Sequence, residues 1–138
     1  MSDSYRSDRA PAAVGLYPHA RRAGNLLFLS GVGPRRSGTN EIPGVTLDGE
    51  GRIVDYDIAV QARSAFDNVR MILEDAGSAW ERLVDVTVYL TNMKADFAAY
   101  NGVWAEYFAA GPPTRTTVEV GALPTPIAIE LKCIATLD

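Results

Sequence analysis

The feature that most constrains the fold is a change of hydrophobic period between residues 57 and 91. Apolar side chains between Asp57 and Gly77 recur at spacings of three and four, which places them on one face of an α-helix: Ile58, Ala62, Ala65, Phe66, Val69, Ile72, Leu73 and Ala76. Asp55 or Asp57 can cap the start of this helix, and Gly77 can end it. Residues 83–91 then alternate between apolar and polar side chains, the pattern of a half-buried strand. We therefore expect helices packed on a sheet.

The flanking segments supply the remaining elements. A short apolar run begins at Leu26 and predicts a buried strand, and the Gly-rich and Pro-rich residues 31–44 predict a loop. A second helix is predicted from an aromatic stripe that Gly111 and two prolines end: Phe97, Tyr100, Trp104, Tyr107 and Phe108. Strands follow at about residues 114–120 and 127–137. The prediction is an α+β fold with two helices packed on one face of a mixed sheet.

The chain is predicted to form one domain. Its 138 residues and 47% hydrophobic content suffice for one compact core. Residues 1–13 contain almost no large apolar side chains, so we expect a flexible N-terminal tail, and we assign residues 14–138 to the single domain.

Composition disfavours several kinds of partner. Thirteen Lys and Arg residues against 17 Asp and Glu give a net charge of −4 without a basic run, so we expect no nucleic-acid partner. No apolar segment resembles a signal peptide or a membrane span, which predicts a cytoplasmic protein that does not bind membranes. The single cysteine, Cys133, cannot form an internal disulfide and fits a reducing compartment.

Several catalytic classes lack their residues. The only histidine is His19 and no G-x-S-x-G motif is present, which disfavours a Ser/His/Asp hydrolase. One histidine and one cysteine cannot make a zinc-deaminase site. The glycine-rich residues 31–38 match neither the dinucleotide-binding nor the P-loop pattern. We therefore expect neither a metal nor a nucleotide cofactor.

Arg115 and Glu130 are the remaining candidates for chemistry. Strand alternation predicts that both point away from the helices, and a short connection between their strands predicts neighbouring strands. They could form a structural salt bridge, or they could bind a carboxylate and handle a water molecule. This semi-polar sheet face suits neither water nor a core, so we expect several chains to associate through it, with a pocket at the interface.

Four separated motifs resemble the RidA/YjgF (Rid) family. They are residues 113–131 (PTRTTVEVGALPTPIAIEL), 15–17 (GLY), 24–31 (GNLLFLSG) and 96–101 (DFAAYN). The motifs occur in the family's order, and the resemblance covers about residues 14–137. It implies a chorismate-mutase-like α+β fold and a homotrimer whose sheets form a central barrel, with active sites in the clefts between subunits.

The resemblance also implies roles for individual residues. Arg115 matches the arginine that binds the substrate carboxylate, and Glu130 matches the glutamate that orients or activates the hydrolytic water. Tyr17, Ser30 and Asn101 match residues that line the same pocket. The implied activity is metal-free hydrolysis of an enamine or imine carboxylate, a reaction in which one proton-transfer group assists.

Departures from the common family pattern favour one branch. Thr117 replaces a cysteine found in many members, which excludes a thiol role and leaves Thr117 as a substrate-binding candidate. Arg35 and Arg36 follow the motif around Ser30, as in 2-aminomuconate deaminases, and either could bind a second carboxylate or be a solvated loop charge. His19 could transfer a proton to departing ammonia or only form hydrogen bonds.

We therefore predict hydrolysis of 2-aminomuconate to 4-oxalocrotonate and ammonia in the degradation of aromatic compounds. Two alternatives remain open at this level. One is a general RidA-type deaminase of 2-imino acids or 2-aminoacrylate. The other is a non-catalytic Rid-like trimer that binds a small molecule.

Overall fold

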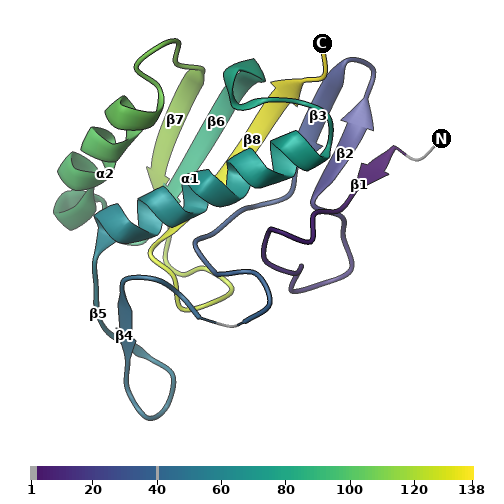
Figure 1. Ribbon diagram of the computed structural model, residues 1–138. Coiled ribbons are helices and arrows are strands. Elements are labelled where there is room, and N and C mark those ends of the chain that lie inside the picture. The colour runs from purple at the N-terminus through teal and green to yellow at the C-terminus, as the bar shows by residue number, and fades with distance from the viewer. Residues whose placement is uncertain (1–2, 40) are drawn as a thin grey trace.

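A computed structural model describes residues 3–39 and 41–138 (Figure 1). Both α-helices cover one face of a six-stranded mixed sheet, and a two-stranded hairpin extends from the body of the domain. The elements in chain order are β1 (Ser4–Tyr5), β2 (Ala20–Ala23), β3 (Leu26–Leu29), β4 (Val45–Leu47), β5 (Ile53–Tyr56), α1 (Ile58–Asp75), the 3-10 helix η1 (Trp80–Arg82), β6 (Leu83–Leu90), α2 (Met93–Tyr107), β7 (Thr114–Glu119) and β8 (Ile129–Thr136). The predicted α+β class is confirmed.

Helix α1 spans the apolar stripe predicted from the sequence, and capping residues lie at both of its ends. The Asp57 side chain accepts hydrogen bonds from the backbone N–H groups of Ala59 and Val60, at 3.0 and 3.2 Å. The helix ends before Gly77, whose φ of 84° requires a residue without a side chain. Of the two predicted caps, Asp57 is therefore the one used.

The sheet has the strand order β1-β2-β3-β8-β6-β7. Strands β6 and β7 are parallel and joined by α2, whereas the other neighbouring pairs in this sheet are antiparallel. Val86 on β6 is buried, and it pairs with Arg115 on β7 and with Cys133 on β8. Strand β6 is therefore the centre of the helix-covered half of the sheet.

One predicted orientation is wrong. Arg115 is in register with Val86, and Thr117 with Val88, and paired residues of parallel strands point to the same face. Both valines are buried under the helices, so Arg115 and Thr117 face the helices rather than the opposite, open face of the sheet. The prediction assumed that a polar side chain points away from the helices. The aromatic rings of α2, however, face the edge strand β7 and contact the Arg115 guanidinium. Glu130 lies on the open face, as predicted.

The predicted adjacency of Arg115 and Glu130 is also wrong. Strand β6 lies between their strands, because it pairs with β7 on one side and with β8 on the other. Two strand spacings and an offset of three residues along the strands separate the backbones of Arg115 and Glu130 by about 14 Å, and the two side chains lie on opposite faces. A cross-strand salt bridge between them within one chain is thus excluded.

The N-terminal segment differs from the predicted flexible tail. Residues 1 and 2 lie outside the described residues. Strand β1 pairs with β2, and Ser7 and Ala10 are 5% and 2% exposed. The segment has few large apolar groups, and polar contacts, described below, hold most of it in place.

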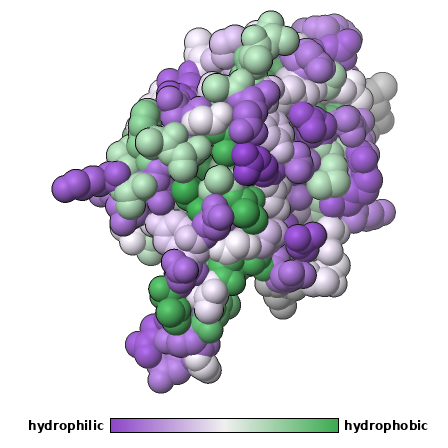
Figure 2. Space-filling view, turned by 60° about the vertical axis from the view of Figure 1, so that its left-hand side comes forward, coloured by the Kyte–Doolittle hydropathy of each residue, from purple (hydrophilic) through white to green (hydrophobic). Residues whose placement is uncertain are grey.

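The hairpin of β4 and β5 was not distinguished in the sequence. Its turn depends on Asp48, whose side chain accepts hydrogen bonds from the N–H groups of Glu50 and Arg52, at 2.8 and 2.9 Å. Figure 2 shows the hairpin protruding at the lower edge of the molecule, where hydrophobic and hydrophilic residues adjoin. Among the described residues, no helix is long and apolar enough to cross a membrane.

The core between the helices and the sheet contains an aromatic cluster around Phe66. The Phe66 ring has its centroid 5.0–6.2 Å from the centroids of four others: Trp80, Trp104, Tyr107 and Phe108. These rings come from α1, η1, α2 and the residue after α2, so the cluster joins both helices to the start of β6.

Phe66→Ala is expected to lower the free energy of unfolding by about 3–5 kcal/mol, because it leaves a cavity within this cluster. Val60→Ala, at an exposed position of the same helix, should change it by less than about 0.5 kcal/mol. Urea unfolding at equal protein concentration measures both. Similar losses in the two variants would show that the cluster does not stabilise the domain.

Candidate active site

A cavity of about 170 Å³ lies beside the ends of β3 and β8. The N-terminal segment, the residues that follow β3, the residues around position 125 and strand β8 all contribute to its wall. Five of the predicted site residues line it: Tyr17, His19, Ser30, Arg35 and Glu130. The structure thus gathers these side chains from segments distant in sequence.

Glu130 carries the carboxyl group of this cavity. It is half-buried on β8, and burial raises the pKa of its carboxyl group. No hydrogen bond or ion pair of its carboxylate is found within residues 3–39 and 41–138. Gly31 makes room for it, since a Cβ at Gly31 would lie 2.8 Å from Oε2 of Glu130. An unpartnered carboxyl group with a raised pKa is suited to general acid–base chemistry.

Tyr17 and Ser30 provide hydroxyl groups. The Ser30 Oγ donates to the carbonyl of Pro18 at 2.7 Å, which leaves the Ser30 oxygen free to accept. The Tyr17 hydroxyl accepts from the N–H of Val14 at 3.2 Å, which leaves its proton free to donate. Together they offer one acceptor and one donor to a ligand beside Glu130.

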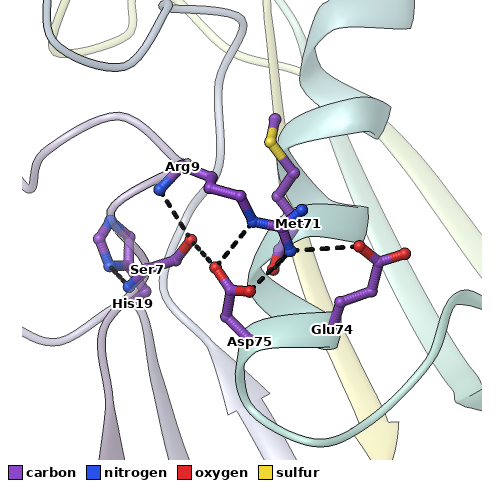
Figure 3. A network of polar contacts seen from close by, with 6 residues as sticks. All are labelled: Ser7, Arg9, His19, Met71, Glu74 and Asp75. Atoms are coloured by element: carbon purple, nitrogen blue, oxygen red, sulfur yellow. Dashed lines mark hydrogen bonds and ion pairs between the residues drawn. The ribbon is translucent and has the colours of Figure 1, made fainter.

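His19 has both ring nitrogens occupied by backbone groups. Its Nδ1 lies 3.0 Å from the N–H of Ser7, a contact drawn in Figure 3, and its Nε2 lies 2.7 Å from the carbonyl oxygen of Pro11. An N–H only donates and a carbonyl only accepts, so Nδ1 is the acceptor and Nε2 carries the proton. This neutral ring holds the N-terminal segment and has no nitrogen left for proton transfer to a ligand.

The two loop arginines lie in different surroundings. Asn68 on α1 donates to the carbonyl of Arg35 at 2.9 Å, and the Arg35 guanidinium, half-buried in the cavity wall, donates to the carbonyl of Ala12 at 2.8 Å. Arg36 is exposed outside the cavity, and its Nε lies 3.8 Å from the Glu41 carboxylate. Of these two arginines, Arg35 is therefore the one that lines the cavity.

Arg115, Asn101 and Thr117 form a second group away from the cavity. The Asn101 side-chain oxygen accepts from the Arg115 guanidinium at 2.8 Å. The guanidinium carbon lies 4.8–5.8 Å from the ring centroids of three α2 residues: Phe97, Tyr100 and Trp104. These contacts fix the plane of the guanidinium while leaving Arg115 only half-buried.

Tyr100 is the functional candidate that the sequence did not single out. Its side chain is fully buried, and its hydroxyl lies 2.8 Å from the Thr117 Oγ1. The ring also contacts Arg115. In the sequence, Tyr100 had been assigned only to the apolar stripe of the helix. Its proximity to Arg115 and Thr117 depends on the unpredicted orientation of β7.

A second, more open groove contains Asp55, Asp57 and Asp96. Asp96 accepts a hydrogen bond from the Tyr56 hydroxyl at 2.6 Å, which ties the hairpin to α2. Within the part of the chain that the structure describes, no group of three or more His, Cys, Asp or Glu residues is arranged to hold a metal ion.

The chain resembles known proteins over nearly its whole length. Residues 7–137 match the family model described as Endoribonuclease L-PSP. A RutC family protein of Pyrococcus horikoshii is 39% identical over 135 residues, 98% of each chain. Reactive Intermediate Deaminase A of Arabidopsis thaliana (chloroplastic) is 37% identical over 131 residues, 95% of this chain and 64% of that protein. The YjgF gene product of E. coli superposes with a TM-score of 0.84 at 34% identity, covering 99% of this chain and 100% of that chain.

The raised pKa of Glu130 has a consequence for stability. Because the folded pKa lies above the usual value of 4.5, stability is lost as pH rises from about 4.5 through the folded pKa. Glu130→Gln removes this penalty, so it should be more stable than the wild type at pH 8, with the advantage vanishing toward pH 4. Urea unfolding across this range measures it. A less stable Glu130→Gln at pH 8 would mean that a partner group holds the carboxylate.

Proposed function

Because the chain belongs to the Endoribonuclease L-PSP family, which includes RutC and RidA proteins, we propose that it hydrolyses enamine or imine carboxylates, with 2-aminomuconate as its preferred substrate. The observation that carries the proposal is the unpartnered Glu130 carboxyl group beside Tyr17 and Ser30 in one cavity. The name of the Arabidopsis relative, Reactive Intermediate Deaminase A, supports deaminase chemistry.

The proposed reaction needs one proton-transfer group and water. The enamine first tautomerises to an imine, and the imine nitrogen takes a proton from solvent. Water then adds to the carbon of this iminium ion while Glu130 accepts a proton from the water. The carbinolamine that forms has a C–OH and a C–NH₂ group. Glu130 gives its proton to the nitrogen, the C–N bond breaks, and the hydroxyl proton returns to solvent, which leaves a ketone and ammonia. In sum, one imine and one water give one ketone and one ammonia.

The proposal requires a second copy of the chain. Arg115 is assigned to the substrate carboxylate, yet within one chain it lies across β6 from Glu130 and outside the cavity. We therefore propose a homotrimer in which Arg115, Asn101 and Thr117 of one copy face the cavity of the next. Apolar side chains on several strands are exposed in a single chain and would be covered by such contacts: Leu26, Phe28, Val84 and Val118.

Arg35 supports a dicarboxylate substrate. If Arg115 of the neighbouring copy binds one carboxylate, the Arg35 guanidinium in the cavity wall is a second cation for the distal carboxylate of 2-aminomuconate. A 2-imino acid with one carboxylate would not use it. Release of ammonia from 2-aminomuconate and from 2-iminopropionate tests the proposal. Equal rates indicate a general imine deaminase, and no release from either indicates a binding protein.

Two variants, each impaired at one of these residues, should restore each other's activity if the site is shared between copies. Arg115→Ala should weaken binding about ten- to hundredfold, and Glu130→Ala should abolish turnover. In mixed trimers formed from equal amounts, about one quarter of the interfaces combine an intact Arg115 with an intact Glu130. Ammonia release should then recover toward about a quarter of the wild-type rate. No recovery in trimers shown to be mixed would contradict a site shared by Arg115 of one copy and Glu130 of the next.

Arg35→Ala and Arg36→Ala form a matched pair for the dicarboxylate assignment. Losing a charged hydrogen bond should lower kcat/KM for 2-aminomuconate about ten- to hundredfold in Arg35→Ala, with a smaller effect on 2-iminopropionate. Arg36→Ala should match the wild type on both, since Arg36 lies outside the cavity. An equal loss on both substrates in Arg35→Ala would show that Arg35 acts through Ala12 instead.

A further inference from the structure

One wall of the cavity is made by a segment with almost no bulky side chains. Pro11, Ala12, Ala13 and Val14 line the cavity, and they follow directly on residues 7–10. We call residues 7–14 the N-terminal wall. Small side chains bury little apolar area, so other contacts must hold this wall against the domain.

Three hydrogen bonds from two cavity-lining side chains hold the wall. His19 binds the N–H of Ser7 and the carbonyl of Pro11, and Arg35 binds the carbonyl of Ala12. A fourth hydrogen bond, from the Ser37 hydroxyl to the carbonyl of Asp8, comes from a residue outside the cavity lining. Each of these is a hydrogen bond to the backbone of the wall.

A charged set of contacts lies outside the cavity, at the end of α1 (Figure 3). Arg9 contacts both oxygens of Asp75, at 2.6 and 3.2 Å, and one oxygen of Glu74, at 3.2 Å. The Ser7 hydroxyl donates to Asp75 at 2.5 Å. Hydrogen bonds from Arg9 and then from Ser7 lower the pKa of the Asp75 carboxyl group.

Helix electrostatics explain why these carboxylates need a cation. Glu74 and Asp75 are the last two residues of α1, where the helix dipole disfavours negative charge, and the last turn of α1 contains no basic residue. Arg9 supplies the missing positive charge from the N-terminal wall, two residues before Pro11. The pair therefore joins the end of a helix to the wall of the cavity.

We propose that Arg9 is a positioning residue for the cavity: its bidentate contact with Asp75 fixes where residues 11–14 lie, without touching the ligand. The kinetic part of this inference rests on the proposed deaminase function. Glu130 is on β8 and not on the wall, so loosening the wall weakens substrate binding more than it slows the chemical steps.

Arg63 is a matched control. Arg63 on α1 pairs with Glu106 on α2 at 3.1 Å, and its side chain is 46% exposed, against 50% for Arg9. Arg63 does not contact the N-terminal wall or line the cavity. Removing either arginine deletes one positive charge together with its exposed ion pairs, to two carboxylates for Arg9 and to one for Arg63, so effects common to both variants reflect charge or general stability.

The test compares Arg9→Ala, Arg63→Ala and the wild type by two measurements. Hydrogen exchange, followed by mass spectrometry on peptides covering residues 7–14, should be faster in Arg9→Ala alone. The KM for 2-aminomuconate should rise about two- to fivefold in Arg9→Ala, with kcat within about twofold. Arg9→Lys keeps the charge without the bidentate geometry and should lie between Arg9→Ala and the wild type.

Each other outcome is decisive. Unchanged exchange in Arg9→Ala, or faster exchange with an unchanged KM, overturns the positioning role. Equal effects in Arg9→Ala and Arg63→Ala overturn it as well. If the wild type releases no ammonia from 2-aminomuconate or 2-iminopropionate, the proposed function fails, and the exchange comparison alone then supports or overturns the holding of the wall by Arg9.

Discussion

The parallel pairing of β6 with β7 is the constraint on which the rest of the arrangement depends. Parallel neighbours need a crossover connection, and α2 provides it while covering the edge of the sheet. Strand β8 must then pair with the other side of β6. This order separates Arg115 from Glu130 within one chain, and it turns Arg115 toward the aromatic rings of α2. The order of the strands therefore keeps these two candidate residues apart within one chain.

The sequence predicts the elements of this fold well and their pairing poorly. Periodicity identified α1, β6 and α2 because each buries one regular stripe of side chains, and the caps at Asp57 and Gly77 have local signals. Strand pairing depends on contacts between residues that are distant in the sequence, and a short stretch of sequence carries no information about them. The face taken by Arg115 was mispredicted for a related reason, since its polar side chain is compatible with an aromatic platform as well as with water.

The candidate site, too, is predicted only in part by the sequence. The motifs in the sequence directed attention to Tyr17, Ser30, Arg35 and Glu130, and the structure brings these four into one cavity. The role of residues 7–13 was missed because hydrophobicity carries no signal for a segment held by hydrogen bonds. Its anchors, such as Asp75, are distant in sequence and are individually unremarkable polar residues.

The partners of the arginines distinguish those suited to binding a ligand from those that hold the fold together. Arg9 and Arg36 contact carboxylates, which compensate their charge. Arg35 is held by a backbone carbonyl, and Arg115 by an amide oxygen and aromatic faces, and no ion pair within the described residues involves either of them. Such neutral partners orient a guanidinium without neutralising it. A half-buried guanidinium held in this way is not paired with a carboxylate of its own chain, which suits it to an anionic ligand.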